Sequence, residues 1–199
     1  MRGGKFRRLT AMRKNPTDPL RGQAETLVAA ADAAASWFRD HSPAFLSAAR
    51  TARLRCRGWR QAAVSAARTR GGPVKADISE FSFSLSEAVE QTAAAVGEAA
   101  RLGPLRDEDL AAAAAALRLA ARALLRAASV SGAARAEALV EAKRLCSEVE
   151  RLRRAVGAES RDSVFFIESI KRSEIAGLLS AAAEAVQRAC DALSGSLAE

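Results

Sequence analysis

The chain has 199 residues, with 26 arginines, 5 lysines and a formal net charge of +8. That length suits one domain or one duplicated domain, and 49% hydrophobic against 27% charged residues excludes wholesale disorder. A single histidine, His41, argues against zinc hydrolases, Ser-His-Asp enzymes and the paired Glu-x-x-His motifs of metal-dependent bundle enzymes. Three distant cysteines form no disulfide framework, so we expect a reducing compartment.

The first half of the predicted fold consists of three helices, at about 19–40, 43–70 and 76–102. Asp18-Pro19 and Ser42-Pro43 are start signals, because a capping side chain precedes a proline whose missing N–H costs nothing in a first turn. Gly71-Gly72-Pro73 and Gly103-Pro104 are stop signals. The predicted inward positions are Leu20, Ala24, Leu27, Ala31, Phe38, Leu46, Ala49, Ala63, Ala67, Phe81, Leu85, Val89, Thr92, Val96 and Ala99.

Three more helices are predicted at about 106–129, 133–156 and 162–195. Acidic residues 107–109 suit the positive end of a helix dipole, and residues 157–160 are expected to break the chain. Residues 110–117 are the longest apolar run, far short of the roughly 20 residues that span a bilayer. The predicted inward positions are Leu139, Leu145, Val149, Leu152, Val164, Ile167, Ile170, Ile175, Leu178, Leu179, Ala182, Val186 and Leu193.

An internal repeat relates the third and sixth predicted helices at an offset of 94 residues. Ser79-Glu80-Phe81 matches Ser173-Glu174-Ile175, and the match continues through Leu85-Ser86 and Leu179-Ser180. Short connections favour antiparallel neighbours. The sequence therefore predicts an all-α, six-helix antiparallel bundle made of two three-helix repeats, at about 17–103 and 104–199, preceded by a flexible basic arm over residues 1–16.

Three parts of the chain match, in order, the motifs of a known family. PVKADI (73–78) and LSEAVE (85–90) stand where that family shows P-x-D-R-E-D-I and A-L-D-D-x-x-D, and EAKR (141–144) stands where it shows E-A-D-R. SIKRSEIAGLLSAAAEAVQRACDAL (169–193) follows its I-K-W-K-E-I-Y-E-x-L-E-D-A-x-D-R-C-E-D-V-A pattern. The chain resembles the PhoU-like family, specifically the short accessory proteins of inorganic phosphate (Pit) transporters. That resemblance implies a non-enzymatic cytoplasmic bundle that acts on a phosphate transporter in the inner membrane.

The departures from the family pattern fall on its acidic residues, which hold metal ions through oxygen ligands. Lys143 replaces the Asp of E-A-D, residues 179–184 keep one acid, and the second predicted helix has Leu-Arg-Cys-Arg at 54–57. We therefore expect no metal or other cofactor. The remaining candidates for a divalent-cation site are Glu87, Glu90, Glu141 and Glu184. Their alternative is a solvated helix face with pairs such as Glu184 and Arg188.

The basic excess is confined to the first third of the chain. Residues 1–70 hold 15 basic and 4 acidic residues, a balance of +11, whereas residues 71–199 hold 16 and 19, a balance of −3. Such a segment favours an acidic partner, which is a membrane surface, a nucleic acid or an acidic protein patch. The candidate partner-binding residues are Arg7, Arg8, Arg13, Lys14, Arg50, Arg53, Arg57 and Arg60, with Arg68 on the same outer face.

The remaining conspicuous residues are expected to be structural. Trp37, Phe38 and Trp59 are interpreted as core or cation–π packing, with a partner-docking or membrane-interface patch as the alternative. Cys56, Cys146 and Cys190 are interpreted as small apolar or half-buried residues. His41 is expected at a turn between the first two helices.

Two functions are left open by the sequence. The first is an accessory protein of inorganic phosphate transport, cytoplasmic and membrane-associated, that docks to a transporter or an anionic membrane surface through its basic first third. The second is a nucleic-acid-associated protein that binds through the arginines of the second predicted helix, although no helix-turn-helix, zinc-finger or aromatic stacking motif accompanies them. Homo-oligomerisation also remains open.

Overall fold

A computed structural model describes residues 17–68, 72–103, 107–162 and 166–195, and every regular element within these ranges is a helix. The helices are α1 (Thr17–Asp40), α2 (Pro43–Ala67), α3 (Gly72–Leu102), α4 (Glu108–Ser129), α5 (Gly132–Asp162) and α6 (Phe166–Ser194). This confirms the predicted all-α bundle of six helices. The predicted flexible arm, residues 1–16, lies outside the described residues.

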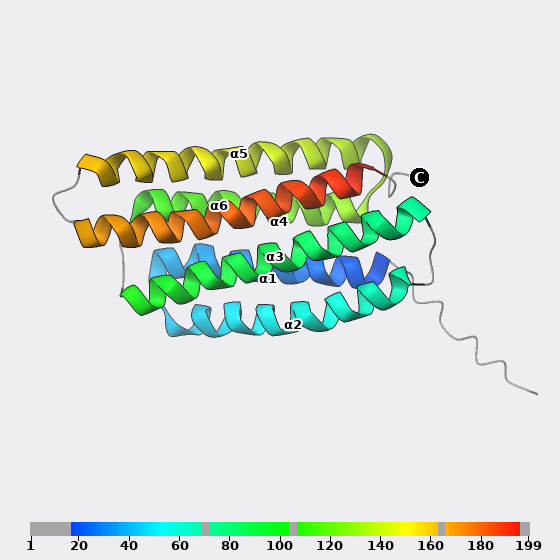
Figure 1. The fold of residues 1–199 in the computed structure, drawn as a ribbon, viewed down its shortest axis with the longest axis horizontal. Coiled ribbons are helices and arrows are strands. Elements are labelled where there is room, and N and C mark those ends of the chain that lie inside the picture. The colour runs from blue at the N-terminus through cyan, green and yellow to red at the C-terminus, as the bar shows by residue number, and fades with distance from the viewer. Residues whose placement is uncertain (1–16, 69–71, 104–106, 163–165, 196–199) are drawn as a thin grey trace, which may run out of the picture.

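The helices run along one common axis, and consecutive helices reverse direction (Figure 1). Within each half of the chain, every helix packs against the other two, so α1–α3 form one triplet and α4–α6 form another. The triplets join where α1 packs on α4 and α3 on α6, which leaves α2 and α5 at opposite outer edges (Figure 1). The duplication behind the two triplets stays a prediction.

Of the two predicted start signals, the one at Ser42 acts as a cap, whereas α1 begins at Thr17, before Asp18, and a further cap is found at Asp107. Ser42 has extended backbone angles, its hydroxyl accepts a hydrogen bond from the Ala44 N–H at 3.4 Å, and Pro43 occupies the first turn of α2. Asp107 caps α4 by accepting from the N–H groups of Asp109 and Leu110, both at 3.0 Å. The same carboxylate pairs with Arg172 of α6, so one buried side chain fixes the start of α4 and joins it to α6.

The predicted break at residues 157–160 is wrong, because α5 continues through Gly157 to Asp162 and α6 begins only at Phe166. One glycine inside a helix costs about 1 kcal/mol relative to alanine, which a long helix packed on two neighbours can offset. The start of α3 is also earlier than predicted, at Gly72. Proline is tolerated at position 73 because N–H groups in the first turn of a helix have no intrahelical acceptor, so the lack of an N–H costs no hydrogen bond there.

Most predicted inward positions are buried, but those at the start of α6 are not. Ile167 and Ile170 are 68% and 49% exposed, so their predicted inward position is wrong, and Val164 lies outside the described residues. At 3.6 residues per turn, Ile170 is turned roughly 140° away from the fully buried Ile175. The five-residue spacing between them does not bring both onto one helical face.

Alanine supplies more than half of the buried hydrophobic positions, so the helices meet over small side chains. Helix α4 presents a side of small residues to its neighbours, since Ala113, Ala114 and Ala116 are all buried. Larger side chains fill the centre between the triplets, and the fully buried ones include Phe81, Leu27, Leu85, Leu117 and Leu124. In the part of the chain that is described, no helix has the length and apolarity needed to cross a membrane.

Cys56, Cys146 and Cys190 are buried free thiols, as predicted. Burial raises the pKa of all three, that of Cys190 to about 12. Thiols with raised pKa values remain protonated at neutral pH and are poor nucleophiles and metal ligands. The three cysteines therefore act as small core residues.

Candidate functional site

Helix α2 carries five arginines and no acidic residue over its 25 residues. Arg50, Arg53, Arg57 and Arg60 are all exposed, and Arg68 follows at the C-cap, also exposed. Spacings of three and four residues place the first four on one side of the helix, as predicted. We call these five residues the α2 basic face. The other predicted partner-binding residues, Arg7, Arg8, Arg13 and Lys14, lie outside the described residues.

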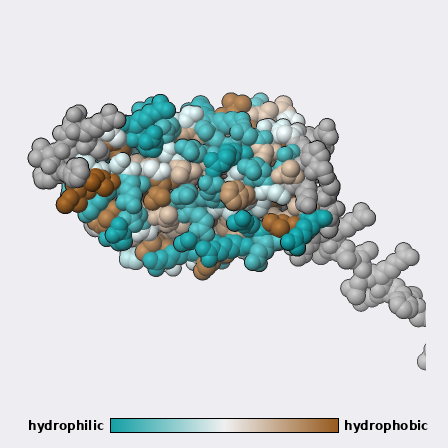
Figure 2. Space-filling model, in the orientation of Figure 1, coloured by the Kyte–Doolittle hydropathy of each residue, from teal (hydrophilic) through white to brown (hydrophobic). Residues whose placement is uncertain are grey.

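Only part of the α2 basic face is neutralised by the rest of the bundle. Arg53 and Arg57 both pair with Glu90 of α3, the latter at 3.3 Å, and the Arg60 guanidinium lies 5.3 Å from the centre of the Phe83 ring. Within the described ranges, Arg50 and Arg68 make no ion pair. The lower edge of the bundle, where α2 lies, is mostly hydrophilic with scattered apolar side chains (Figure 2). An exposed arginine without a partner can bind a carboxylate or phosphate.

Arginines bind three of the four candidate metal-site acids. Glu90 binds Arg53 and Arg57, Glu141 binds Arg126, and Glu87 accepts from Arg188 at 2.7 Å. Glu184 lies exposed on α6. The predicted pair between Glu184 and Arg188 is wrong, because Arg188 reaches across to α3 instead. Among the described residues, no three His, Cys, Asp or Glu side chains gather as a metal site.

Lys143 of α5 has an acidic partner on α6. Its ammonium group lies 2.6 Å from an Asp191 carboxylate oxygen, and this hydrogen bond raises the pKa of the lysine. Asp191 is thereby neutralised without an added ion.

Three arginines of α5 are neutralised within the same helix. Glu148 binds Arg151 at 2.6 Å, and Glu150 binds Arg153 at 2.7 Å and Arg154 at 3.0 Å. The Ser180 hydroxyl of α6 also donates to Glu150 at 2.6 Å. Hydrogen bonds from Arg153 and then Ser180 lower the pKa of Glu150 to about 2. The outer edge at α5 therefore carries compensated charge, unlike the edge at α2.

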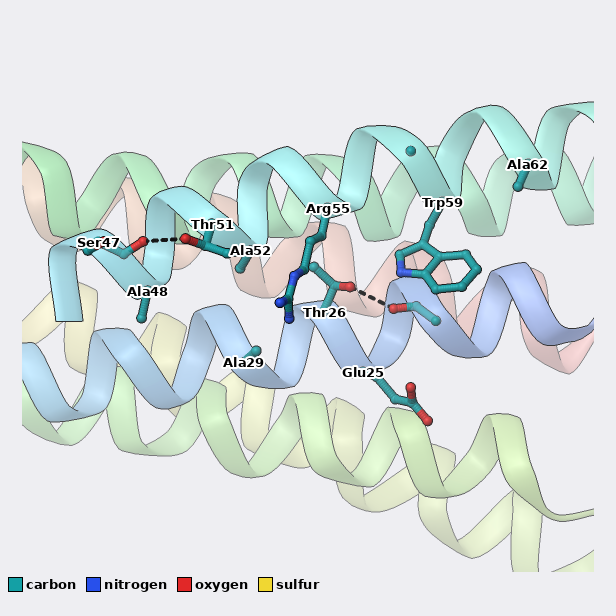
Figure 3. Close-up of a pocket in the computed structure, with 12 residues that line it drawn as sticks. Glu25, Thr26, Ala29, Ser47, Ala48, Thr51, Ala52, Arg55, Trp59 and Ala62 are labelled. Carbon is teal, nitrogen blue, oxygen red and sulfur yellow. Dashed lines mark hydrogen bonds between the residues drawn. The ribbon is translucent and has the colours of Figure 1, made fainter. Parts of the chain in front are cut away.

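A groove of about 850 Å³ runs between α1 and α2, on the side of α2 opposite to the arginines that contact α3, and we call it the α1–α2 groove (Figure 3). Small residues from both helices line it, with Trp59 at one end and Arg55 reaching from α2 toward α1. Thr26 and Thr51 donate their hydroxyls back to carbonyls of their own helices, at 2.7 and 2.9 Å. The lining residues are Gly22, Glu25, Thr26, Ala29, Ser47, Ala48, Thr51, Ala52, Arg55, Gly58, Trp59 and Ala62.

Trp59 owes its place in this groove to Gly22. A Cβ atom at position 22 would lie 2.6 to 2.9 Å from three atoms of the indole ring, so only glycine lets the ring pack against α1. Trp37 and Phe38 are core residues, as predicted, but Trp59 is 40% exposed and forms a groove wall, so a core position is wrong for Trp59. The groove was not predicted from the sequence. Its available signal was the run of small residues at three- and four-residue spacing on both helices.

His41 lies in the predicted link between α1 and α2, where its φ of 52° places it in the left-handed region. Its N–H donates to the Trp37 carbonyl at 2.8 Å, and its ring meets the Trp37 ring edge-on at 6.1 Å between centroids. This contact continues the end of α1 into the turn. The histidine therefore has a structural role at the connection of the two helices.

Comparison with family models, curated proteins and solved structures gives no match. The chemistry of the surface remains as a guide to function. That surface carries an arginine-bearing helix face and, on the other side of the same helix, a groove lined mostly by small residues, and the arginine face suits the binding of a negatively charged group.

Proposed function

We propose that this protein is a non-enzymatic accessory protein of inorganic phosphate transport. In this proposal it lies on the cytoplasmic side of the membrane and docks through the α2 basic face to an acidic surface of the transporter. The motif resemblance in residues 73–193 supports the assignment to phosphate transport. The charge distribution of α2 supports docking as the mode of action.

The observation that carries the proposal is the absence of acids from α2. Glu90 is shared by Arg53 and Arg57, while Arg50 and Arg68 have no ion-pair partner in the described part of the chain. Near an anionic surface, each basic side chain contributes about 1 kcal/mol. Because the Debye length is only about 8 Å at physiological ionic strength, such docking must weaken as salt rises.

The acids of the metal-site pattern support a role without bound metal. Glu87, Glu90 and Glu141 each bind arginine, so coordination of a divalent cation would require breaking an existing ion pair. Lys143 beside Asp191 adds a fixed positive charge that disfavours a cation at that position. We therefore propose that docking, and no metal chemistry, transmits the regulatory effect.

The test is co-purification from membranes of the source cell at low and high salt. A face variant with Arg50→Glu, Arg60→Glu and Arg68→Glu is compared with a control that makes the same charge change elsewhere, Arg122→Glu, Arg144→Glu and Arg154→Glu. All six arginines are exposed. We expect the wild type and the control to recover a phosphate permease at low salt only, and the face variant to lose it. Equal recovery by all three proteins, or no permease with any of them, would contradict the proposal.

The same experiment evaluates nucleic acid as a second candidate partner. The specific observation in its favour is that Arg50, Arg53, Arg57 and Arg60 form a row along one exposed helix side. Binding to duplex DNA by neutralised phosphates falls steeply with salt. Recovery of nucleic acid in place of the permease, with loss in the face variant, would replace the transport proposal with this one.

A further inference from the structure

The α1–α2 groove has the dimensions and the lining of a seat for a helix. It extends along α2 from Ser47 to Ala62, which at 1.5 Å per residue is about 22 Å, or four helical turns. Ala29 and Ala48 are exposed and face each other across it (Figure 3). Small side chains on two adjacent helices allow a third helix to approach within the usual 8–10 Å between axes.

The backbone along the groove favours a helical occupant over an extended one. Both walls are helices whose N–H and C=O groups bond within their own helix, so they offer no edge to which an extended peptide could add hydrogen bonds. A helix satisfies its own backbone and needs only side-chain contacts. The hydroxyls of Thr26 and Thr51 also bond within their own helices. The groove therefore offers a partner mainly a surface for side-chain packing, because its backbone groups and threonine hydroxyls already have hydrogen-bond partners.

The charge of the groove favours an acidic occupant. Arg55 reaches into it and makes no ion pair within the ranges that the structure describes (Figure 3). The acidic lining residue, Glu25, already binds Arg21 at 2.9 Å on α1. The remaining arginines of α2 lie toward α3 and outside the groove lining, but α2 has no acidic residue, so the helix as a whole is positively charged. A carboxylate on the occupant would give Arg55 a partner.

Gly58 is a second sign of a close-approaching occupant. It lines the groove in the middle of α2, where glycine weakens a helix, yet a Cβ atom there would meet nothing within 4 Å. The packing of the chain itself therefore gives no reason for glycine at this position. A helix seated in the groove would supply the reason, because its backbone could approach α2 closely at Gly58.

We propose that the α1–α2 groove binds an amphipathic acidic helix of a partner protein, with its small apolar side packed on Ala29 and Ala48 and a carboxylate on Arg55. This inference rests on the proposed docking function and specifies its mode. The α2 basic face attracts the partner, and the groove fixes the register and direction in which it binds.

The experiment uses a fluorescent peptide of about 15 residues, with alanine and leucine on one helical side and glutamate on the other. Two control peptides carry lysine in place of glutamate or a central proline. Anisotropy gives the affinity, and the emission of Trp59 in a Trp37→Phe background reports binding beside it, because the chain has two tryptophans. We expect the glutamate peptide to bind with a change in Trp59 emission, and both controls to bind at least about tenfold more weakly.

Groove variants locate the binding. Ala48→Phe fills the groove at an exposed position, and Arg55→Glu reverses its cation, while Ala112→Phe adds the same bulk at an exposed position on α4. We expect both groove variants to weaken the glutamate peptide about tenfold and Ala112→Phe to leave its affinity unchanged. Thermal unfolding of each variant checks that the bundle is intact. Unchanged affinity in Ala48→Phe, equal binding of the lysine peptide, or no binding of the glutamate peptide would overturn the inference.

The membrane experiment separates this inference from the proposed function. If the face variant loses the phosphate permease and Ala48→Phe retains it, docking stands and the groove is not its seat. If no protein recovers the permease but the glutamate peptide binds in the groove, the groove inference stands and the transport role fails.

Discussion

Helices α2 and α5 occupy equivalent outer edges of the two triplets, and both are rich in arginine, but their charges are handled differently. In α5, Glu148 and Glu150 precede their arginine partners by three or four residues, so the ion pairs close within the helix. Helix α2 contains no acidic residue, and its Arg53 and Arg57 both form ion pairs with Glu90 of α3. The two edges therefore differ in the acids available to their arginines and not in the presence of arginines.

The contacts that α5 and α2 make with their neighbouring helices also differ in charge. Between α5 and α6, the Ser180 hydroxyl donates to Glu150 at 2.6 Å. Between α2 and α3, Ser86 has neutral partners, since the Gln23 amide donates to it at 3.0 Å and the Cys56 thiol lies 3.8 Å away. An offset of 94 residues relates Cys56 to Glu150 and Ser86 to Ser180. One triplet therefore has a charged contact where the other has a neutral one.

The largest expected effect tests whether the triplets are equally important to stability. Leu85 of α3 and Leu179 of α6 are both fully buried, at positions related by the offset of 94. Truncation of either to alanine should lower the free energy of unfolding by about 2–5 kcal/mol, from lost transfer energy and a residual cavity. Urea denaturation of the two variants measures this. A difference between them larger than the effect of the weaker one would break the equivalence of the two halves.

A smaller effect is expected at the contact that shapes the α1–α2 groove. Gly22→Ala places a methyl group against the Trp59 ring and should cost about 1–3 kcal/mol, as overpacking does. In a Trp37→Phe background the displaced Trp59 should emit at longer wavelength. With Trp59→Ala present, the same change should instead stabilise the helix. Destabilisation that persists without the indole would assign the cost to another contact.

The charged contact at Glu150 should make the α5 edge sensitive to acid. Its pKa is lowered from 4.5 to about 2, so its contribution is fully present above the unfolded value and is lost as the pH falls through the folded value. Glu150→Gln should cost about 1 kcal/mol at neutral pH, since the side chain is partly exposed. Urea titrations at several pH values should show this difference shrinking below about pH 4. A constant difference would contradict the assignment.

The smallest expected effect has the opposite sign. Gly58→Ala should stabilise α2 by about 0.5–1 kcal/mol, because alanine restricts the unfolded chain and its methyl group enters open space. Thermal unfolding measures the gain. Destabilisation would show that the glycine has a role in the folded chain itself, and would remove its support for a close-approaching partner.

Local chemistry made much of this fold predictable from the sequence. The caps at Ser42 and Asp107 involve residues two or three positions away, and the inner side of α3 follows a simple helical period from Phe81 to Ala99. The outer position of the α2 arginines follows from the same period. Helix count, most boundaries and the basic face therefore required no knowledge of how the helices pack.

Contacts between distant parts of the chain were not predictable in this way. Arg188 pairs with Glu87, which precedes it by 101 residues, although Glu184 lies one turn away on its own helix. The α1–α2 groove depends on Trp59 lying over Gly22, and this follows from the docking of two helices. The exposure of Ile170 likewise depends on which side of α6 meets α3. Tertiary packing decides each of these features.

The alanine-rich interior has a consequence for how the protein tolerates sequence change. Ala30, Ala114 and Ala182 have no accessible surface, and their methyl groups set the spacing between neighbouring helices. At such positions the alanine side chain has only one methyl group to lose, while a larger side chain would push the neighbouring helices apart. Substitutions in the interior should therefore be confined to exchanges among the smallest residues. New functional side chains can be acquired only on the outer sides of the bundle.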